Sequence, residues 1–250
     1  MSAHLSMRSG NPALGSDTFR LPRTAISDDV MTIGGAVNKT ALATAILLMT
    51  ATYTWNLGPA DPRVATLTMV GVIGGLVMAI ATVMRKEWAS YTTPGYAALE
   101  GLALGGISVG FESHYPGVVS QAVFLTFGTL GALLVAYRSG IIKPTENFKL
   151  GVFAATGGIG LVYLIGMVMS FFGAGIPLIH GSGPIGIGFS VVVVGVAALN
   201  LVLDFDFIEQ GAERRVPKYM EWYAAFGLLV TLVWLYLELL RLLAKLQDRR

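Results

Sequence analysis

A few acidic side chains within long apolar stretches are the residues of this chain most able to do chemistry. They occur in four places: Glu100; Asp204 and Asp206, together with their polar neighbour Asn200; Glu221; and Glu238. A charged group in a bilayer costs several kcal/mol unless it is paired or hydrated, so each such acid is a functional hypothesis. A carboxylate at a membrane boundary can coordinate a hydrated cation, or pair with a base and release it when protonated. The pattern therefore predicts proton or cation binding.

The acids of the sixth apolar stretch need not act together. Asn200 and Asp204 are four residues apart and share a helix face, whereas Asp206 is turned by about 200° to a different one. The alternative interpretation is that these acids simply lie at a solvated end of the helix. Arg85 closes the second apolar stretch and lies, by topology, on the same membrane side as Asp204. Anchoring by the positive-inside rule explains Arg85 equally well without any gate.

Two other acids have structural explanations. Glu238 precedes Arg241 by three residues on the same helical face, which predicts an interfacial ion pair. Glu221 opens the last apolar stretch, where a carboxylate interacts favourably with the helix dipole, and Lys218 is nearby. Both acids are therefore expected to stabilise helix ends.

Enzymatic signatures are weak. Residues 106–110 match G-x-S-x-G, but the histidines are His4, His114 and His180, all in the tail or in predicted outer loops, so no Ser/His dyad forms within a span. The chain has no cysteine, which excludes thiolate metal sites and Cys nucleophiles. We expect no enzymatic activity and no cofactor. The glycines instead have the small-residue spacing of a membrane-helix interface: Gly71 and Gly75, Gly101 and Gly105, Gly106 and Gly110.

The composition sets the class of protein that positions these residues. Hydrophobic residues make up 54% of the 250 residues and charged ones 13%, well below the ~25% of a soluble domain. The chain is therefore expected to be an integral membrane protein whose main partner is the lipid bilayer. A net charge of +2 is too even for nucleic-acid binding.

Continuous apolar stretches predict an all-α, polytopic bundle of seven transmembrane helices. Residues 1–39 are predicted to be a soluble, flexible tail, residues 40–246 the transmembrane domain and residues 247–250 a short C-terminal tail. The expected spans are residues 40–57, 64–84, 95–111, 117–137, 150–173, 185–203 and 220–243.

Lys and Arg predict a cytoplasmic N-terminus, because the loops on that side hold the basic residues and the outer loops hold only Arg63. Seven spans would place the basic C-terminal tail outside, against the rule. Either the last segment is re-entrant or the earlier loops override the tail. We favour the second reading, because no proline interrupts residues 220–243.

Four segments in order resemble one known family: GYAALEGLALG from residue 95, SHY from 113, LDFDFIE from 203 and WLYLELLRLL from 234. Over about residues 38–246 the chain is similar to the Bax inhibitor-1/YccA-like proteins, or transmembrane Bax inhibitor motif proteins. The resemblance implies a bacterial-type member in the inner membrane. It also implies a seventh helix inside a ring of six.

The resemblance further implies a pH-sensitive calcium leak controlled by two aspartates that share a proton and by an arginine latch. Asp204 matches the first aspartate, and Arg85 matches the latch. Thr231 occupies the place of the second aspartate and cannot ionise, so the strict two-aspartate switch is altered. Asp206 or Glu221 are the acids that would substitute.

The leading hypothesis is therefore a calcium or cation leak channel gated near Arg85 and Asp204, with Asp204 and Asp206 as transient calcium ligands. The weaker candidates for the ion path are Glu100, Asn200, Glu221 and Thr231. One alternative is a non-conducting regulator that binds a membrane protease or another stress-response partner through its N-terminal tail. A second alternative is a proton-coupled transporter.

Overall fold

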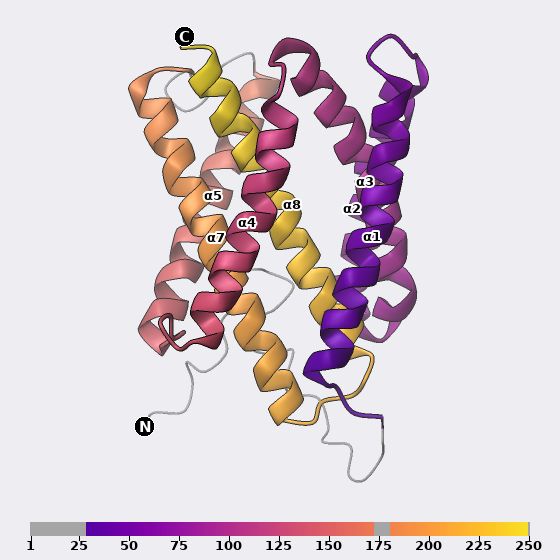
Figure 1. The fold of residues 1–250 in the computed structure, drawn as a ribbon, viewed down its shortest axis with the longest axis vertical. Helices are drawn as coiled ribbons and strands as arrows, with labels where there is room; N and C mark the ends of the chain where they lie inside the picture. The colour runs from indigo at the N-terminus through magenta and orange to yellow at the C-terminus, as the bar shows by residue number, and fades with distance from the viewer. Residues whose placement is uncertain (1–28, 173–180, 250) are drawn as a thin grey trace. The chain divides into compact units, whose positions relative to one another are not determined.

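The computed structural model describes residues 29–172 and 181–249, and this part of the chain is helical. The elements are α1 (Ile33–Leu57), α2 (Arg63–Met84), the short 3-10 helix η3 (Lys86–Trp88), α3 (Ala89–His114), α4 (Val118–Arg138), α5 (Glu146–Phe171), α7 (Pro184–Glu213) and α8 (Met220–Gln247) (Figure 1). Extended pairing in the described residues is limited to one bridge, between Val30 and Pro217. The all-α prediction is therefore confirmed for the described part.

Several helices are longer than predicted, among them α1, α3 and α7. α1 begins at Ile33, before the expected residue 40, because Thr32 caps it by accepting a hydrogen bond from the Gly35 N–H at 2.9 Å. α7 continues to Glu213, past the expected residue 203, so both Asp204 and Asp206 are helical. Residues 1–28 of the predicted tail, with His4, lie outside the described residues, as does His180.

Six described helices are long and apolar enough to cross a membrane: α1, α2, α4, α5, α7 and α8. α3 has 26 residues, or about 39 Å at 1.5 Å per residue, so its length also suffices. It falls short in apolar character, because it contains Thr92, Thr93, Glu100 and Ser108. The multi-span architecture is thus confirmed, while a seventh span at α3 stays a prediction.

A glycine and an Asp–Arg contact shape the turn after α1. Gly58 ends α1 with a φ of 75°, a conformation that favours glycine. Asp61 then accepts the Arg63 backbone N–H at 2.9 Å and pairs with its guanidinium at 2.7 Å. The Arg63 side chain holds the pKa of Asp61 below its ordinary value. The Asp61 side chain therefore accepts a hydrogen bond from the first backbone N–H of α2.

The chain divides into two compact units. Unit 1 comprises the described residues 120–205 and 231–249, and unit 2 comprises residues 29–119 and 206–230. The division passes through α7 after Phe205 and through α8 before Thr231. Each unit is described by itself.

In unit 2, α3 packs closely against α1 and α2, which lie beside it in Figure 1. A Cβ on Gly105 would lie 2.3 Å from the Ala51 carbonyl oxygen, and one on Gly71 would lie 2.5 Å from that of Leu99. The predicted small-residue interface is confirmed at residues 71, 75, 101, 105 and 106. Gly110 faces open space and is not part of it.

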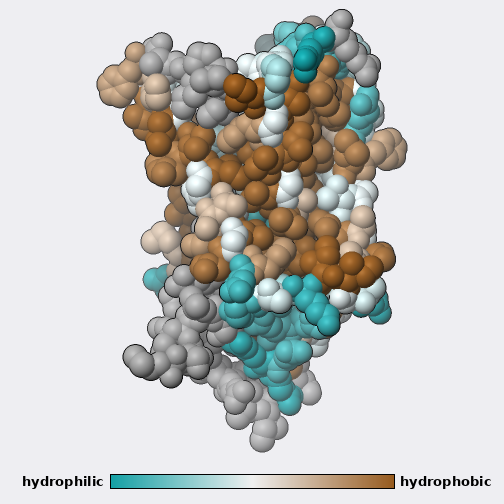
Figure 2. Space-filling model, turned by 90° about the vertical axis from the view of Figure 1, so that its left-hand side faces the viewer, coloured by the Kyte–Doolittle hydropathy of each residue, from teal (hydrophilic) through white to brown (hydrophobic). Residues whose placement is uncertain are grey.

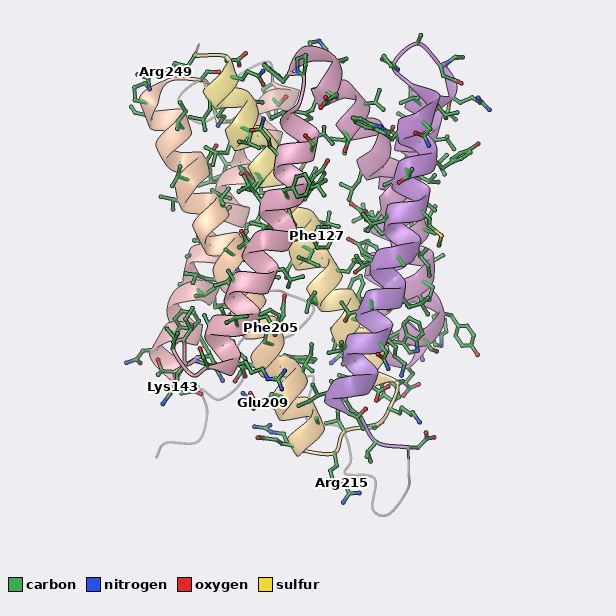
Figure 3. All side chains as sticks on the ribbon, viewed as in Figure 1. Phe127, Lys143, Phe205, Glu209, Arg215 and Arg249 are labelled. Carbon is green, nitrogen blue, oxygen red and sulfur yellow. The ribbon has the colours of Figure 1, made fainter. Side chains whose placement is uncertain are left out.

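In unit 1, aromatic contacts join the helices. Tyr137 of α4 and Phe205 of α7 have ring centroids 5.7 Å apart, and Tyr163 of α5 meets Phe189 of α7 at 6.2 Å. Figure 3 labels Lys143 in the α4–α5 turn and Arg249 near the C-terminus, and they lie at opposite ends of this unit. We call these the turn end and the C-terminal end of unit 1.

Apolar side chains are abundant on the surface. Figure 2 shows one face, largely covered by hydrophobic residues, with hydrophilic ones gathered toward its ends. Such an extensive apolar surface would be unfavourable in water and suits lipid contact. Exposed examples on α2 and α4 are Met69, Leu76, Phe124 and Val135.

We predict that Gly105→Ala destabilises the protein. The added Cβ would meet the Ala51 backbone carbonyl at 2.3 Å, and forcing a methyl group into a tight interface costs about 1–3 kcal/mol. Thermal unfolding in detergent should show a lower Tm. Gly157→Ala in α5 is the control, because a Cβ there meets nothing within 4 Å. Equal Tm values for the two variants would contradict this close packing.

Candidate functional site

Asp204 lies on α7 and is only 1% exposed. Neither of its carboxylate oxygens has a hydrogen-bond partner among the described residues. Thr231 of α8 faces the carboxylate, although its hydroxyl does not meet hydrogen-bond geometry toward it. A buried acceptor left unpaired costs about 1–3 kcal/mol, and more when it is charged. The described residues therefore supply no hydrogen bond that offsets the cost of burying this carboxylate.

Asn200 lies one helical turn before Asp204 and adds a third unpaired oxygen. Its side-chain amide donates to the Thr156 hydroxyl and to the Val196 carbonyl, both at 2.8 Å. Its Oδ1 is buried and has no partner in the described residues. Three acceptor oxygens are therefore grouped on one face of α7, as the four-residue spacing predicts.

Thr231 stands where the resemblance places the second aspartate, and the structure brings it to Asp204. Its hydroxyl can donate or accept a hydrogen bond but cannot ionise. A pair of carboxylates sharing one proton is therefore not available at this level of α7 and α8. Asp204 is the single ionisable member of the pair.

Asp206 has a different environment. It is half-buried, and its Oδ2 accepts a hydrogen bond from the Gln210 side chain at 2.5 Å. Gln210 in turn accepts a bond from Arg214 at 3.3 Å, so these residues form a polar row along α7. No group of three or more His, Asp or Glu side chains suited to a metal ion is found in the part of the chain described. A transient calcium site at Asp204 and Asp206 stays a prediction.

Arg85 ends α2, and its side chain is exposed. Its guanidinium carbon lies 5.7 Å from the centroid of the Trp88 ring, a cation–π contact. Arg85 belongs to unit 2 and Asp204 to unit 1. The latch between these two residues therefore stays a prediction.

Glu100 is half-buried in the interface of α3 with α2. A Cβ on Gly75 would lie 2.7 Å from its Oε2, so the glycine provides the space that this carboxylate occupies. The acid and the small-residue stripe, which the sequence presents as separate features, thus meet in the structure.

Glu221 joins the starts of α1 and α8 within unit 2. Its Oε1 accepts hydrogen bonds from the Thr32 N–H at 2.9 Å and the Thr32 hydroxyl at 3.0 Å, and its Oε2 pairs with Lys39. Lys218, the neighbour expected from the sequence, pairs instead with Asp29 at 3.5 Å. That expectation is corrected: the cation that pairs with Glu221 comes from α1.

Two backbone hydrogen bonds strengthen the same connection. The Met31 N–H donates to the Val216 carbonyl at 2.8 Å, and the Lys218 N–H donates to that of Asp29 at 3.0 Å. Gly35 leaves room for the Glu221 carboxylate, which a Cβ would strike at 2.1 Å. Glu221 is fully occupied by these contacts, so its role is structural.

Glu238, the acid of the predicted ion pair, is 1% exposed and therefore buried among other side chains. The predicted ion pair with Arg241 is confirmed, with an N–O distance of 2.7 Å. The Tyr163 hydroxyl also donates to the same Oε1 at 2.9 Å, whereas Oε2 is buried and has no partner in the described residues. Sequence reasoning missed the burial of Glu238, whose one signal was its place seven residues after Thr231.

We predict that Glu221→Gln lowers the stability of the protein by about 2 kcal/mol. The change removes the charge that Lys39 and the Thr32 donors require, and hydrogen bonds to charged groups contribute roughly 1.5–3 kcal/mol. Glu213→Gln is the matched control, because Glu213 is exposed at the end of α7. Thermal unfolding of both variants measures the difference, and an unchanged Tm for Glu221→Gln would refute the structural role.

Comparison with known proteins identifies the family. The sequence model for the family described as Bax inhibitor 1 like matches residues 11–248, nearly the whole chain. A search of curated proteins finds no match. With its multiple membrane-spanning helices and this match, the chain is a multi-pass membrane protein that belongs to the Bax inhibitor 1 like family.

Proposed function

We propose that this protein is a cation leak channel, with calcium as a permeant ion and protons as its regulator. The observation that supports it most is Asp204, a buried carboxylate whose two oxygens have no hydrogen-bond donor among the described residues. Burying an unpaired carboxylate in a membrane protein costs free energy, which favours a functional reason for its presence. Oxygen ligands of this kind suit calcium.

The proposed architecture has seven spans, with α3 as the seventh and α8 at the centre. The length of α3 supports the first part, since 26 residues reach across a bilayer. Burial supports the second: 67% of the most apolar window of α8 is buried, against 11–39% in the other five candidate spans. A helix surrounded by others would have this property.

In the proposed gate, Arg85 holds Asp204 when the channel is closed. Acidification protonates Asp204, the neutral acid no longer attracts the guanidinium, and the path opens. The side chains beside Asp204 within its own unit, Asn200 and Thr231, carry no charge, so Arg85 would be the one cation that opposes protonation. The gate would therefore respond to a single proton at Asp204.

We predict that Asp204→Asn loses the pH dependence of calcium flux, because the amide can neither ionise nor attract Arg85. Arg85→Gln should raise the flux at neutral pH several-fold, because the latch is removed. The measurement is calcium entry into dye-loaded liposomes that contain the full chain, with Glu213→Gln as the control. Equal flux for wild type and Asp204→Asn, or no flux from folded wild type, would rule out this function.

We also predict that Thr231→Asp moves the pH response. A second carboxylate beside Asp204 would let two acids share one proton, because like charges at short range cannot both ionise easily. The midpoint of calcium flux should move to higher pH by about one unit or more, whereas Thr231→Asn, which adds no charge, should leave it in place. The same liposome assay run over a range of pH measures both variants. Identical midpoints would show that residue 231 does not act on Asp204.

A further inference from the structure

Four buried side-chain atoms in the described residues have no hydrogen-bond partner, and all four are acceptor oxygens of unit 1. They are Oδ1 of Asn200, both carboxylate oxygens of Asp204 and Oε2 of Glu238. Buried polar atoms are nearly always paired, so such a concentration requires an explanation. The proposed gate uses Asp204, with Asn200 as its uncharged neighbour, but leaves Glu238 without a role.

Glu238 lies on the same face of α8 as the residue that faces Asp204. Thr231, Glu238 and Lys245 follow one another at intervals of seven residues, and a helix drifts only ~20° over each such interval. Their side chains therefore form a row toward the C-terminal end of unit 1. Glu238 stands about 10 Å along the axis from Thr231, at 1.5 Å per residue.

Polar side chains of α5 and α7 lie beside this row. On α5, Thr156 accepts a bond from Asn200, and Tyr163, seven residues later, donates to Glu238. On α7, Ser190 accepts a hydrogen bond from Lys245 at 2.9 Å. Polar side chains of α5, α7 and α8 thus meet at successive levels between Asp204 and Lys245. We call this row of contacts the polar seam of unit 1.

The ion pair at Glu238 joins a buried acid to a partly exposed cation. Arg241 is 48% exposed, while Glu238, with which it pairs, is 1% exposed. The Arg241 guanidinium also lies 5.5 Å from the centroid of the Tyr163 ring. The exposed half of this ion pair is therefore the cation, and the buried half is the acid.

The charges around Glu238 determine which ion it can take. Arg241 pairs with it and Lys245 interacts with it electrostatically, so two cations surround one carboxylate. A divalent metal ion would be repelled by this arrangement. The same two cations also favour the charged carboxylate over the protonated one, whereas burial of the unpaired Oε2 favours the neutral acid, so a proton binds at Glu238 only where the effect of burial is the larger. The groups that face the acid are thus Tyr163, Arg241 and Lys245, and only Oε2 is open to a ligand.

We propose that Glu238 is a second proton-binding site, located on the polar seam toward the C-terminal end of unit 1, with Tyr163 and Arg241 as its positioning residues. Oε2 takes the proton from a hydronium ion, which leaves one water and a neutral carboxylic acid. Oε1 continues to accept the Tyr163 hydrogen bond, and Arg241 turns to water. Deprotonation returns the proton to water and restores the ion pair.

The two acids act as separate sites because they stand on different levels of the seam. Direct transfer over about 10 Å is too far for a hydrogen bond, so water must connect them. This inference rests on the proposed function only for the role of Asp204 as the other site of the path. Proton binding at Glu238 can be measured without any ion flux.

The test is infrared difference spectroscopy of the full chain in lipid, titrated over the pH range in which it stays folded. We expect carboxylic-acid carbonyl bands from two buried acids, one absent in Glu238→Gln and the other absent in Asp204→Asn. Glu213→Gln, an exposed acid at the end of α7, should keep both bands. Tyr163→Phe should shift the Glu238 band and leave that of Asp204 unchanged.

An identical titration for wild type and Glu238→Gln would overturn the proposal, because Glu238 would then be a permanently charged ion pair. If Glu238→Gln does not fold, Tyr163→Phe decides: an unchanged set of bands contradicts the proposal. Proton entry into pyranine-loaded liposomes adds a second measurement, with a several-fold decrease expected for Glu238→Gln. A Glu238 band without calcium flux would refute the channel alone, and calcium flux without that band would refute this site alone.

Discussion

The arrangement of this protein depends on how buried carboxylates are stabilised inside apolar helices. Removing a carboxylate from water costs several kcal/mol, and only donors or cations placed by neighbouring helices offset it. Glu221 receives the Thr32 donors and the Lys39 cation, so all of its oxygens are occupied. Glu238 has one oxygen occupied and one unpaired, and Asp204 has neither occupied. The three acids thus form a graded series, from a structural contact to a site that needs an external partner.

The degree of pairing also separates the roles of the two units. In unit 2, close glycine contacts join α3 to its neighbours, and the Glu221 contacts join α1 to the start of α8. Both carboxylate oxygens of Glu221 are paired in this network, which favours a fixed arrangement. In unit 1 the unpaired oxygens lie along one seam, where binding or loss of a proton alters the interaction energy. We therefore expect a response to pH more in unit 1 than in unit 2.

Local spacing predicted the helices, the glycine interface, the shared face of Asn200 and Asp204, and the pairing of Glu238 with Arg241. It could not predict the partner of Glu221, because Lys39 lies 182 residues away. The burial of Glu238 was missed for the same reason: Tyr163, 75 residues earlier, covers it. Periodicity specifies which residues share a helix face, but the packing of the helices decides what that face meets. Arg85, in the other unit, remains a candidate on sequence grounds.

Thr231 gives this seam its particular electrostatic character. Two carboxylates about 4 Å apart would repel by ~4 kcal/mol at an effective dielectric of 20, which forces them to share a proton. With threonine at this position, the next acid on the same face is Glu238, about 10 Å along α8. At that separation the same repulsion falls to ~1.7 kcal/mol, and Arg241 offsets part of it. In the proposed mechanism, the larger separation therefore replaces one strongly coupled pair by two separate proton sites.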